Sequence, residues 1–408
     1  MRRRSAAVLP GVVLALVCLV LLVTPAVGAG WTRPQRVPSR NGSGLSSLHE
    51  LASDGDTLHL LHARSGPRKT DDRVVYQRSG NGGGSWTNES ALWVSRSNQD
   101  AVIPNLAIAA RSGLVVAVFR VRGKHGAALL ARVSRNGGRT FATKVTIASA
   151  RSSRGLGVPA VAIGDGNAVV IGWTDRNSHQ VRLRRSTNAG HSFGPPAKVA
   201  SSGLSIDCHG PRVIDGLVGL TASGSTIHVA WSDAPNGACI ADRVRIRTSR
   251  DDGRTWGQPR LVTSTASFGW PEMSARSGRL LISLQRPDGS LLLARSTDSG
   301  RTFHQQTFQA NGKRELGAAD VLLGDGGKAW LAVPDIAYRG GRVASSRLRI
   351  RVSNDSGRIW QPGTTIVADA ARLRQAPNLG IWHGKPVVLF QSGPVSGLRP
   401  HIWALRAR

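Results

Sequence analysis

The chain has 408 residues, of which 40% are hydrophobic and 48 are glycine, and its formal net charge is +30. This apolar content excludes a disordered chain, and so many glycines are typical of short strands joined by tight turns. The charge favours polyanionic partners such as acidic glycans, wall polymers or nucleic acid, although the arginines are spread along the sequence, which favours a compositional origin.

Residues 1–29 are predicted to be a secretory signal peptide. Arg2–Arg4 precede the apolar run Ala7–Val23, and the small residues that follow fit cleavage near Gly28 or Ala29. The alternative is an uncleaved signal anchor, because the run almost reaches the roughly 20 residues that span a bilayer. We expect cleavage, a secreted protein and one domain over residues 30–408, with membrane attachment only if the leader is retained.

Six copies of one octet follow, with the pattern Ser-x-Asp/Asn-x-Gly-x-Ser/Thr-Trp/Phe. They occupy residues 79–86, 134–141, 186–193, 249–256, 296–303 and 353–360, and only the last departs, with Ile359 at the seventh position. The Asp or Asn can accept hydrogen bonds from its own turn, the Gly permits a positive φ, and the aromatic residue anchors the turn in the core. We therefore interpret the octets as structural staples of hairpins and not as catalytic motifs.

The segments around each octet alternate like β-strands. Val181–Arg185 precedes one octet, Gln258–Val262 follows another, and Leu106–Ala110 and Leu114–Arg120 supply two more strands before the next octet. Four strands in about 50 residues form one blade of a β-propeller. The sequence predicts an all-β propeller with four antiparallel strands per blade and the octet turns on one face.

The two ends of the domain are predicted to share a blade. Counting sets of strands gives seven blades, and the last, Pro377–Arg408, lacks an octet and a fourth strand. Trp31–Ser39 repeats the pattern of Trp256–Ser264 after an octet, so we expect it to pair beside His401–Leu405 and close the ring. The alternative is six blades with a C-terminal extension.

The octets resemble the Asp-box, or bacterial neuraminidase repeat, of the sialidase superfamily, over almost all of residues 30–408. The resemblance implies a propeller that binds or cleaves glycans. It also implies three arginines for a substrate carboxylate, a tyrosine nucleophile paired with a glutamate, and an acid/base aspartate. Where that family has an arginine before the first octet, this chain has Ser46–Glu50, and its two tyrosines are Tyr76 and Tyr338.

Candidate site residues are expected at the central channel, on the face opposite the octet turns, where the first strand of each blade begins. The candidate catalytic residues are Glu272, Asp207, Glu315 and Tyr338, and the candidate ligand-binding residues are Asn105, His209, Arg212 and Asn378. Such a set suits a paired-carboxylate hydrolase or an anion-binding site. The Pro-Asn and Pro-Glu pairs in it also fit strand entry alone.

Cys208 and Cys239 are predicted to form a disulfide on this same face, with two separate buried thiols as the alternative. The eleven histidines show no spacing typical of metal ligands, and no glycine-rich nucleotide-binding loop is present. We expect a monomer without cofactor or metal and with no specific nucleic-acid partner.

Two functions of different class follow. The first is a binding propeller that holds an acidic or cell-surface glycan at the channel face. The second is a glycan-cleaving enzyme, either an exo-sialidase-like glycoside hydrolase or a polysaccharide lyase.

Overall fold

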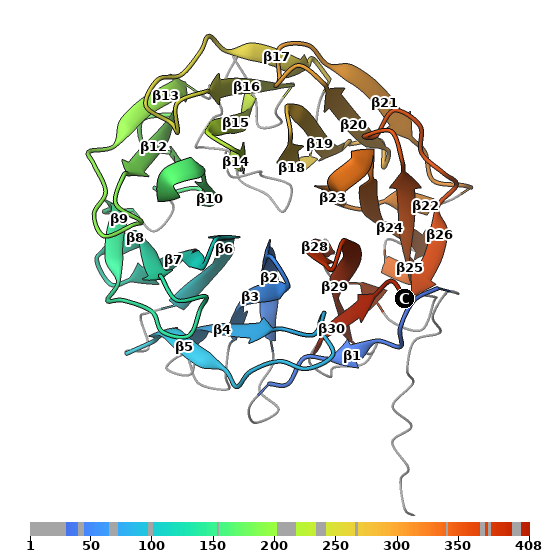
Figure 1. Cartoon of the computed structure of the whole chain (residues 1–408), viewed down its shortest axis with the longest axis horizontal. Coiled ribbons are helices and arrows are strands. Elements are labelled where there is room, and N and C mark those ends of the chain that lie inside the picture. The colour runs from blue at the N-terminus through green and yellow to red at the C-terminus, as the bar shows by residue number, and fades with distance from the viewer. Residues whose placement is uncertain are drawn as a thin grey trace, which may run out of the picture.

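The alternating runs around the octets form seven blades arranged in a ring around a central channel (Figure 1). The computed structural model describes residues 30–39, 45–64, 72–96, 101–152, 155–201, 218–233, 242–265, 268–312, 314–339, 342–367, 372–373, 377–393 and 401–408. Within these ranges, no helix is both long enough and apolar enough to cross a membrane.

Blades one to four each contain four antiparallel strands, ordered from the channel outward. The strands are β2 (Leu45–Asp54), β3 (Thr57–Arg64), β4 (Arg73–Ser79) and β5 (Ser90–Val94); β6 (Ala101–Arg111), β7 (Leu114–Gly123), β8 (Gly126–Ser134) and β9 (Val145–Ala150); β10 (Ala160–Ile163), β11 (Val169–Asp175), β12 (Gln180–Ser186) and β13 (Ala197–Ser201); and β14 (Val218–Ser223), β15 (Thr226–Asp233), β16 (Arg243–Ser249) and β17 (Arg260–Thr263).

Blades five to seven follow the same plan, and two of them carry one extra short strand, β22 or β27. Their strands are β18 (Phe268–Arg276), β19 (Arg279–Gln285), β20 (Leu291–Ser296) and β21 (His304–Phe308); β22 (Arg314–Leu316), β23 (Asp320–Leu323), β24 (Ala329–Arg339), β25 (Arg342–Ser353) and β26 (Thr364–Val367); and β27 (Arg372–Leu373), β28 (Asn378–Trp382), β29 (Lys385–Gly393), β30 (His401–Arg406) and β1 (Gln35–Arg36). The short 3-10 turns η3 (Asp165–Asn167) and η4 (Asp325–Gly327) join the first two strands of blades three and six.

The N-terminal segment closes the ring on blade seven, as predicted. In β1, Gln35 pairs with Ala404 of β30, and Trp31 forms a further bridge to Ala407. Trp31 is 8% exposed and packs with apolar residues of blades six and seven, including Phe390. The prediction of seven blades is confirmed, and the alternative of six blades is wrong.

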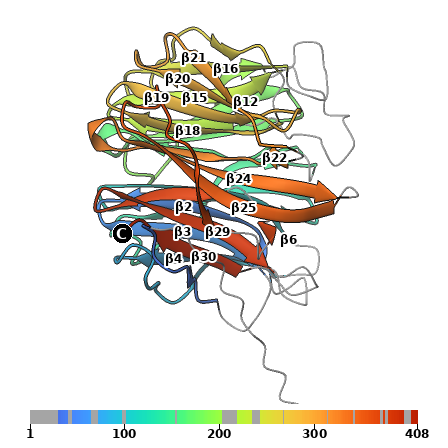
Figure 2. The same ribbon diagram turned by 90° about the vertical axis from the view of Figure 1, so that its right-hand side faces the viewer.

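The apolar core is divided among the interfaces between blades. The described part of the chain contains seven apolar clusters, and each joins one blade to the next. The cluster between blades two and three, for example, contains Val116 on β7 and Ile171 and Trp173 on β11. Seen from the side, the sheets stack face to face (Figure 2). Each blade therefore depends on both of its neighbours for the burial of its apolar side chains.

The octets form the hydrogen-bonded staples that the sequence predicts. In the fourth octet, the hydroxyls of Ser249 and Thr255 donate to the Asp251 carboxylate over 2.7 and 2.6 Å, and the Thr255 N–H donates over 2.9 Å. Gly253 has a φ of +80°. The octet glycine also contacts the preceding blade: a methyl group on Gly138 would lie 1.7 Å from the Tyr76 hydroxyl oxygen. The staple therefore fastens its own hairpin and also docks it onto the neighbouring blade.

Asp251→Ala is expected to lower the free energy of unfolding by about 1 to 2 kcal/mol, because the turn loses the acceptor of its hydrogen bonds. The same bonds hold the pKa of Asp251 near 2, below its usual range. Asp242→Ala removes the same charge from an exposed position just before β16 and serves as the control. Denaturant unfolding of both variants measures the effect, and equal losses would show that the staple contributes nothing beyond its charge.

Candidate functional site

The inner strand of each blade brings one residue to the same level of the channel, three or four positions before the turn into its second strand. On four consecutive blades, five, six, seven and one, these residues are polar: Glu272, Asp320, Asn378 and Glu50. Their strands β18, β23, β28 and β2 lie side by side around the channel (Figure 1). We call these four residues the polar arc.

The side chains of the polar arc point from each blade toward the next. Residues opposite each other in an antiparallel pair lie on the same face of the sheet. Asn378 is opposite Leu389, which packs against blade one. Asp320 reaches blade seven directly, because its carboxylate accepts a hydrogen bond from the Leu379 N–H over 2.6 Å. The same carboxylate accepts a second hydrogen bond, over 2.7 Å, from the N–H of the next residue in its own strand, Val321. The polar groups therefore follow one another around one half of the channel.

The other half of the channel wall carries only small residues at this level. Blades two, three and four have Ala107, Ala160 and Gly219 at the corresponding positions. At Gly219 the wall of blade five is so close that a Cβ atom would lie 2.4 Å from the Pro271 carbonyl oxygen. The polar arc therefore faces residues with no side chain larger than a methyl group.

The carboxyl groups of the arc are partly buried and hold their protons unusually strongly. Burial, with the nearby charge of Asp320, raises the pKa of Glu272 to about 8. Burial also raises the pKa of Asp320 to about 7, although the N–H groups of Leu379 and Val321 oppose this by favouring its charged form. Burial and the charges of Glu272 and Asp320 raise the pKa of Glu50 well above its usual range. Near pH 7 the arc therefore offers both protonated carboxyls, which donate hydrogen bonds, and carboxylates, which accept them.

Asn378 adds an acceptor without a partner. Asn378 is 8% exposed, and its Oδ1 accepts no hydrogen bond from any described residue. Buried amide oxygens are nearly always hydrogen-bonded, to protein, water or ligand. The Asn378 carbonyl is therefore a group that a ligand or water molecule in the channel would satisfy.

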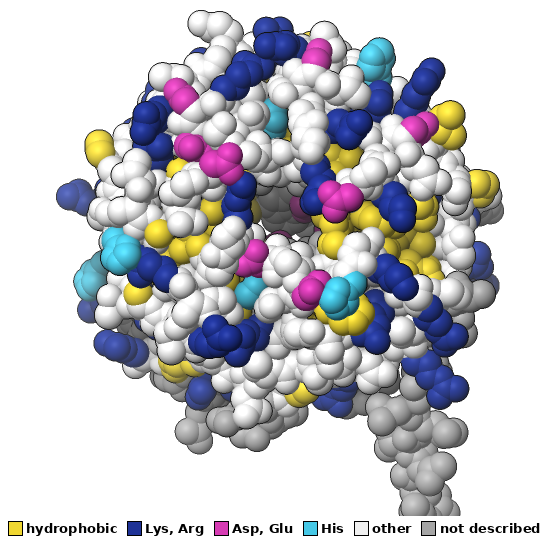
Figure 3. Space-filling view, in the orientation of Figure 1, with side chains coloured by type: hydrophobic (Ala, Val, Ile, Leu, Met, Phe, Trp, Pro, Cys, Tyr) yellow, Lys and Arg dark blue, Asp and Glu magenta, His cyan; other side chains and the backbone are white. Residues whose placement is uncertain are grey.

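The channel widens toward the face that carries the octet turns. A cavity of about 520 Å³ lies there, within the usual range for small-molecule sites. Its wall is formed mainly by inner strands of blades one to five, and six of its 17 lining residues are alanines: Ala52, Ala109, Ala110, Ala162, Ala222 and Ala275. At its rim Arg111 pairs with Asp165, and Arg276 pairs with Asp325. Figure 3 shows the central opening with basic and acidic side chains around it.

Comparison with known proteins relates this architecture to sialidases. The phage phi92 endosialidase aligns with 92% of this chain and 69% of its own length, at 10% identity and a TM-score of 0.51. The NanB sialidase of Streptococcus pneumoniae aligns with 93% of this chain and 70% of its own length, at 12% identity and a TM-score of 0.51. Trypanosoma rangeli sialidase, as its covalent intermediate with 2,3-difluorosialic acid, aligns with 94% of this chain but 59% of its own, at 12% identity and 0.51. This chain shares the β-propeller fold of these sialidases.

Apart from the octets, comparison of the sequence alone reveals no relative. No protein-family model matches it, and no curated protein matches it. At 10–12% identity the likeness of the sialidase-like propeller to these structures concerns the fold, so the chemistry of the site has to be argued from the residues themselves.

Two of the predicted site residues, Glu272 and Asn378, belong to the polar arc of the sialidase-like propeller. Asn105 lies in β6, and its side chain falls outside the described part. The predicted site residues Asp207, His209 and Arg212 and the predicted Cys208–Cys239 disulfide also lie outside the described residues.

Glu315 and Tyr338 lie together on blade six, away from the polar arc. Glu315 is on β22, which pairs with the outer part of β24, where Tyr338 is 43% exposed. Burial and the charge of Glu315 raise the pKa of Tyr338, which disfavours the phenolate. Asp335 is occupied by ion pairs with Arg314 and, over 3.7 Å, Arg349.

The arginine and tyrosine set that the resemblance implies has no counterpart on the inner strands. On β2, β6, β10, β14, β18, β23 and β28, arginine occurs only as Arg111 and Arg276, both at the turns on the octet face. No tyrosine occurs on these strands. Among the described residues there is also no group of three or more His, Cys, Asp or Glu side chains that could hold a metal ion.

Glu50 and Asp320 were not among the predicted site residues. Neither directly follows a proline, the feature that marks Glu272 and Asn378 in the sequence. The usable signal is the distance to the next turn: Glu50, Glu272 and Asn378 each stand four residues before the last residue of their inner strand. Counting back from the turns would have aligned them.

Proposed function

We propose that this sialidase-like propeller is a secreted glycan-binding protein whose central channel holds an uncharged, hydroxyl-rich part of its glycan. The observation that carries the proposal is the polar arc itself, four hydrogen-bonding side chains on one half of the channel wall, with only small residues at the same level on the other half. The leader-like residues 1–29 support secretion. The similar solved structures are named sialidases and an endosialidase, which supports a glycan as the ligand.

The charges of the arc favour an uncharged sugar over an acidic one. Three carboxyl groups would repel a carboxylate or sulfate, more strongly as each loses its proton. A sugar hydroxyl can donate to an ionised carboxylate or to the Asn378 carbonyl, and it can accept from a protonated carboxyl. A set of carboxyl groups in which some are protonated and others are ionised therefore matches a ligand that both donates and accepts hydrogen bonds.

One observation favours a second function, the hydrolysis of a glycosidic bond. Glu272 and Asp320, with pKa values of about 8 and 7, would differ in protonation near pH 7.5. A protonated carboxyl beside an ionised one is the arrangement with which glycoside hydrolases protonate the leaving oxygen and activate water or attack the sugar. In that case Glu272 would be the acid and Asp320 the base or nucleophile.

A screen of neutral and acidic oligosaccharides, followed by titration calorimetry with the tightest neutral binder, tests the binding proposal. We expect Glu272→Gln and Asn378→Ala each to weaken binding by about tenfold or more, the usual effect of removing one buried hydrogen bond to a ligand. Glu315→Gln removes a carboxylate of blade six outside the arc and should leave the affinity unchanged. Equal losses in all three variants, or binding restricted to acidic sugars, would contradict the proposal.

Fluorogenic glycosides distinguish hydrolysis from binding. Turnover that Glu272→Gln abolishes, while affinity is retained, would establish the second function, because glutamine keeps the shape of the side chain but cannot transfer a proton.

A further inference from the structure

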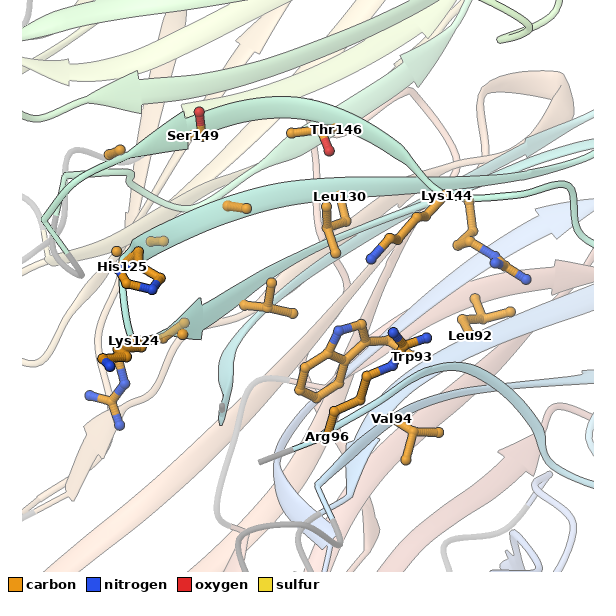
Figure 4. A pocket seen from close by; sticks show the side chains of 18 of the residues that line it. Leu92, Trp93, Val94, Arg96, Lys124, His125, Leu130, Lys144, Thr146 and Ser149 are labelled. Atoms are coloured by element: carbon orange, nitrogen blue, oxygen red, sulfur yellow. The ribbon is translucent and has the colours of Figure 1, made fainter. Parts of the chain in front are cut away.

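A second large hollow lies on the rim of the propeller, between blades one and two. Its volume is about 1330 Å³, and it runs between β5 of blade one and the outer strands β8 and β9 of blade two. Figure 4 shows Trp93, Arg96 and Lys144 near one end, with Lys124 and His125 at the other. We call it the rim groove. It shares no lining residue with the polar arc.

The rim groove is strongly cationic. Its lining includes six Arg or Lys residues and one histidine, and no described lining residue is an Asp or Glu: Arg96, Arg122, Lys124, His125, Arg132, Lys144 and Arg151. All of these are exposed except Arg132, which is half-buried. Burial lowers the pKa of Arg132, because the charged guanidinium has lost part of its hydration. A bound anion would offset this desolvation. A concave wall of one sign attracts oppositely charged ligands more strongly than a flat surface does.

The remaining lining suits a sugar chain. Trp93 is half-buried and packs on the apolar cluster between blades one and two, so it presents a flat apolar surface at the groove. Leu92 and Leu130, which are buried in the cluster between blades one and two, form an apolar floor. On the opposite wall, Thr146 and Ser149 of β9 are exposed and supply hydroxyl groups.

We propose that the rim groove binds a segment of a linear acidic polysaccharide, with sugar rings packed on Trp93 and their carboxylate or sulfate groups paired with Arg96, Lys124 and Lys144. The floor from Ala127 to Arg132 extends roughly 15–20 Å at the rise of a β-strand, so the site accommodates several sugar units. This site is separate from the channel, and its anionic ligand differs from the uncharged sugar proposed there.

The groove favours a polysaccharide over a single-stranded nucleic acid. Proteins that hold single strands combine a cationic track with several aromatic side chains on which successive bases stack. The described lining of the rim groove has one such residue, Trp93, and its other neutral polar groups are hydroxyls. One aromatic surface with hydroxyls and cations matches alternating sugar rings and charges.

Binding of polygalacturonate to the full chain, measured by titration calorimetry, tests this proposal. Its methyl-esterified form has the same backbone without the charges, and heparin distinguishes sulfates from carboxylates. We expect polygalacturonate or heparin to bind, the esterified polymer to bind at least about tenfold more weakly, and the affinity to fall as salt shortens the Debye length from about 10 Å at 0.1 M to about 3 Å at 1 M.

Two triple variants locate the site. Arg96→Ser with Lys124→Ser and Lys144→Ser removes three charges from the rim groove. Arg254→Ser with Arg301→Ser and Arg358→Ser removes three exposed charges from octet turns of blades four to six. We expect a loss of at least about tenfold for the first and less than about threefold for the second. Trp93→Ala should weaken binding about as much as the triple variant of Arg96, Lys124 and Lys144 does. Trp93→Phe should retain part of the affinity that Trp93→Ala loses.

Three outcomes would overturn the proposal. They are equal losses in the two triple variants, equal binding of the esterified polymer, and tighter Trp93-dependent binding of oligothymidylate than of either acidic polysaccharide. Thermal melting of each variant identifies losses due to misfolding. Because the polar arc is unchanged in all of these proteins, their binding of the neutral oligosaccharide reports separately on the channel.

Discussion

Trp31→Ala is expected to lower the free energy of unfolding by about 3 to 5 kcal/mol, the usual cost of truncating a large buried aromatic side chain. Trp31 lies at the closure, where it bridges to Ala407 and packs between blades six and seven. Its loss leaves a cavity and also loosens the strand that covers the edge of β30. Guanidinium unfolding, with the slope and midpoint compared to wild type, measures the effect.

Trp93→Ala provides the control, because Trp93 lies on a strand that is already paired within its own blade and is only half-buried. Its cost should be about half that of Trp31→Ala or less. A deletion of residues 30–39 should be more destabilising still, and a synthetic peptide of this segment should restore stability in proportion to its concentration. A deletion variant as stable as wild type would show that the closure contributes nothing.

Glu272→Gln is expected to protect the protein against alkaline pH. The folded-state pKa of Glu272, about 8, lies above its ordinary value of 4.5, so the folded state binds the proton more tightly than the unfolded state does. The stability from this proton is therefore complete below about pH 4.5 and is lost as the pH rises through about 8. Each pKa unit corresponds to about 1.4 kcal/mol. The free energy of unfolding of wild type should therefore fall by about 2 to 3 kcal/mol between pH 6 and pH 9, and that of the variant should not show this fall.

Denaturant unfolding of both proteins at pH 6, 7, 8 and 9 measures this difference. The buried histidines His59, His62 and His228, whose pKa values burial lowers to about 4, change stability on the acid side in both proteins and cancel in the comparison. Glu315→Gln should follow wild type at every pH. Parallel curves for wild type and Glu272→Gln would mean that the arc is solvated and does not hold its protons.

The fold was predictable because its determinants are local and repeated. Each octet defines a hairpin within eight residues, and six copies set the blade length before any long-range contact is considered. The closure was predictable because Trp31–Ser39 repeats the pattern that follows an octet. Only the extra strands β22 and β27 went unpredicted, since a strand of two or three residues has no periodicity to detect.

The sites were harder to predict because they depend on contacts between distant residues. Glu50 and Glu272 are 222 residues apart and interact only when the ring is closed and both inner strands have the correct register. The cations of the rim groove are spread between Arg96 and Arg151, and along the chain they look like part of a uniform excess of arginine. Their separation in sequence favoured a compositional origin of the charge, whereas the fold gathers seven basic side chains in one groove.

The pairing of β1 with β30 also sets the order in which the molecule can be completed. The Arg406 N–H donates to the Thr32 hydroxyl across 374 residues of chain, so β1 has no partner until β30 has been synthesised. Contacts between segments so far apart in sequence form late, because a long loop must close before they can stabilise anything. Blades one to six can dock in turn as they emerge, but blade seven forms only when both ends of the domain are present. Until β30 is made, β29 would present an unpaired strand edge, so a chain that lacks β30 would stay open to pairing with other copies of itself.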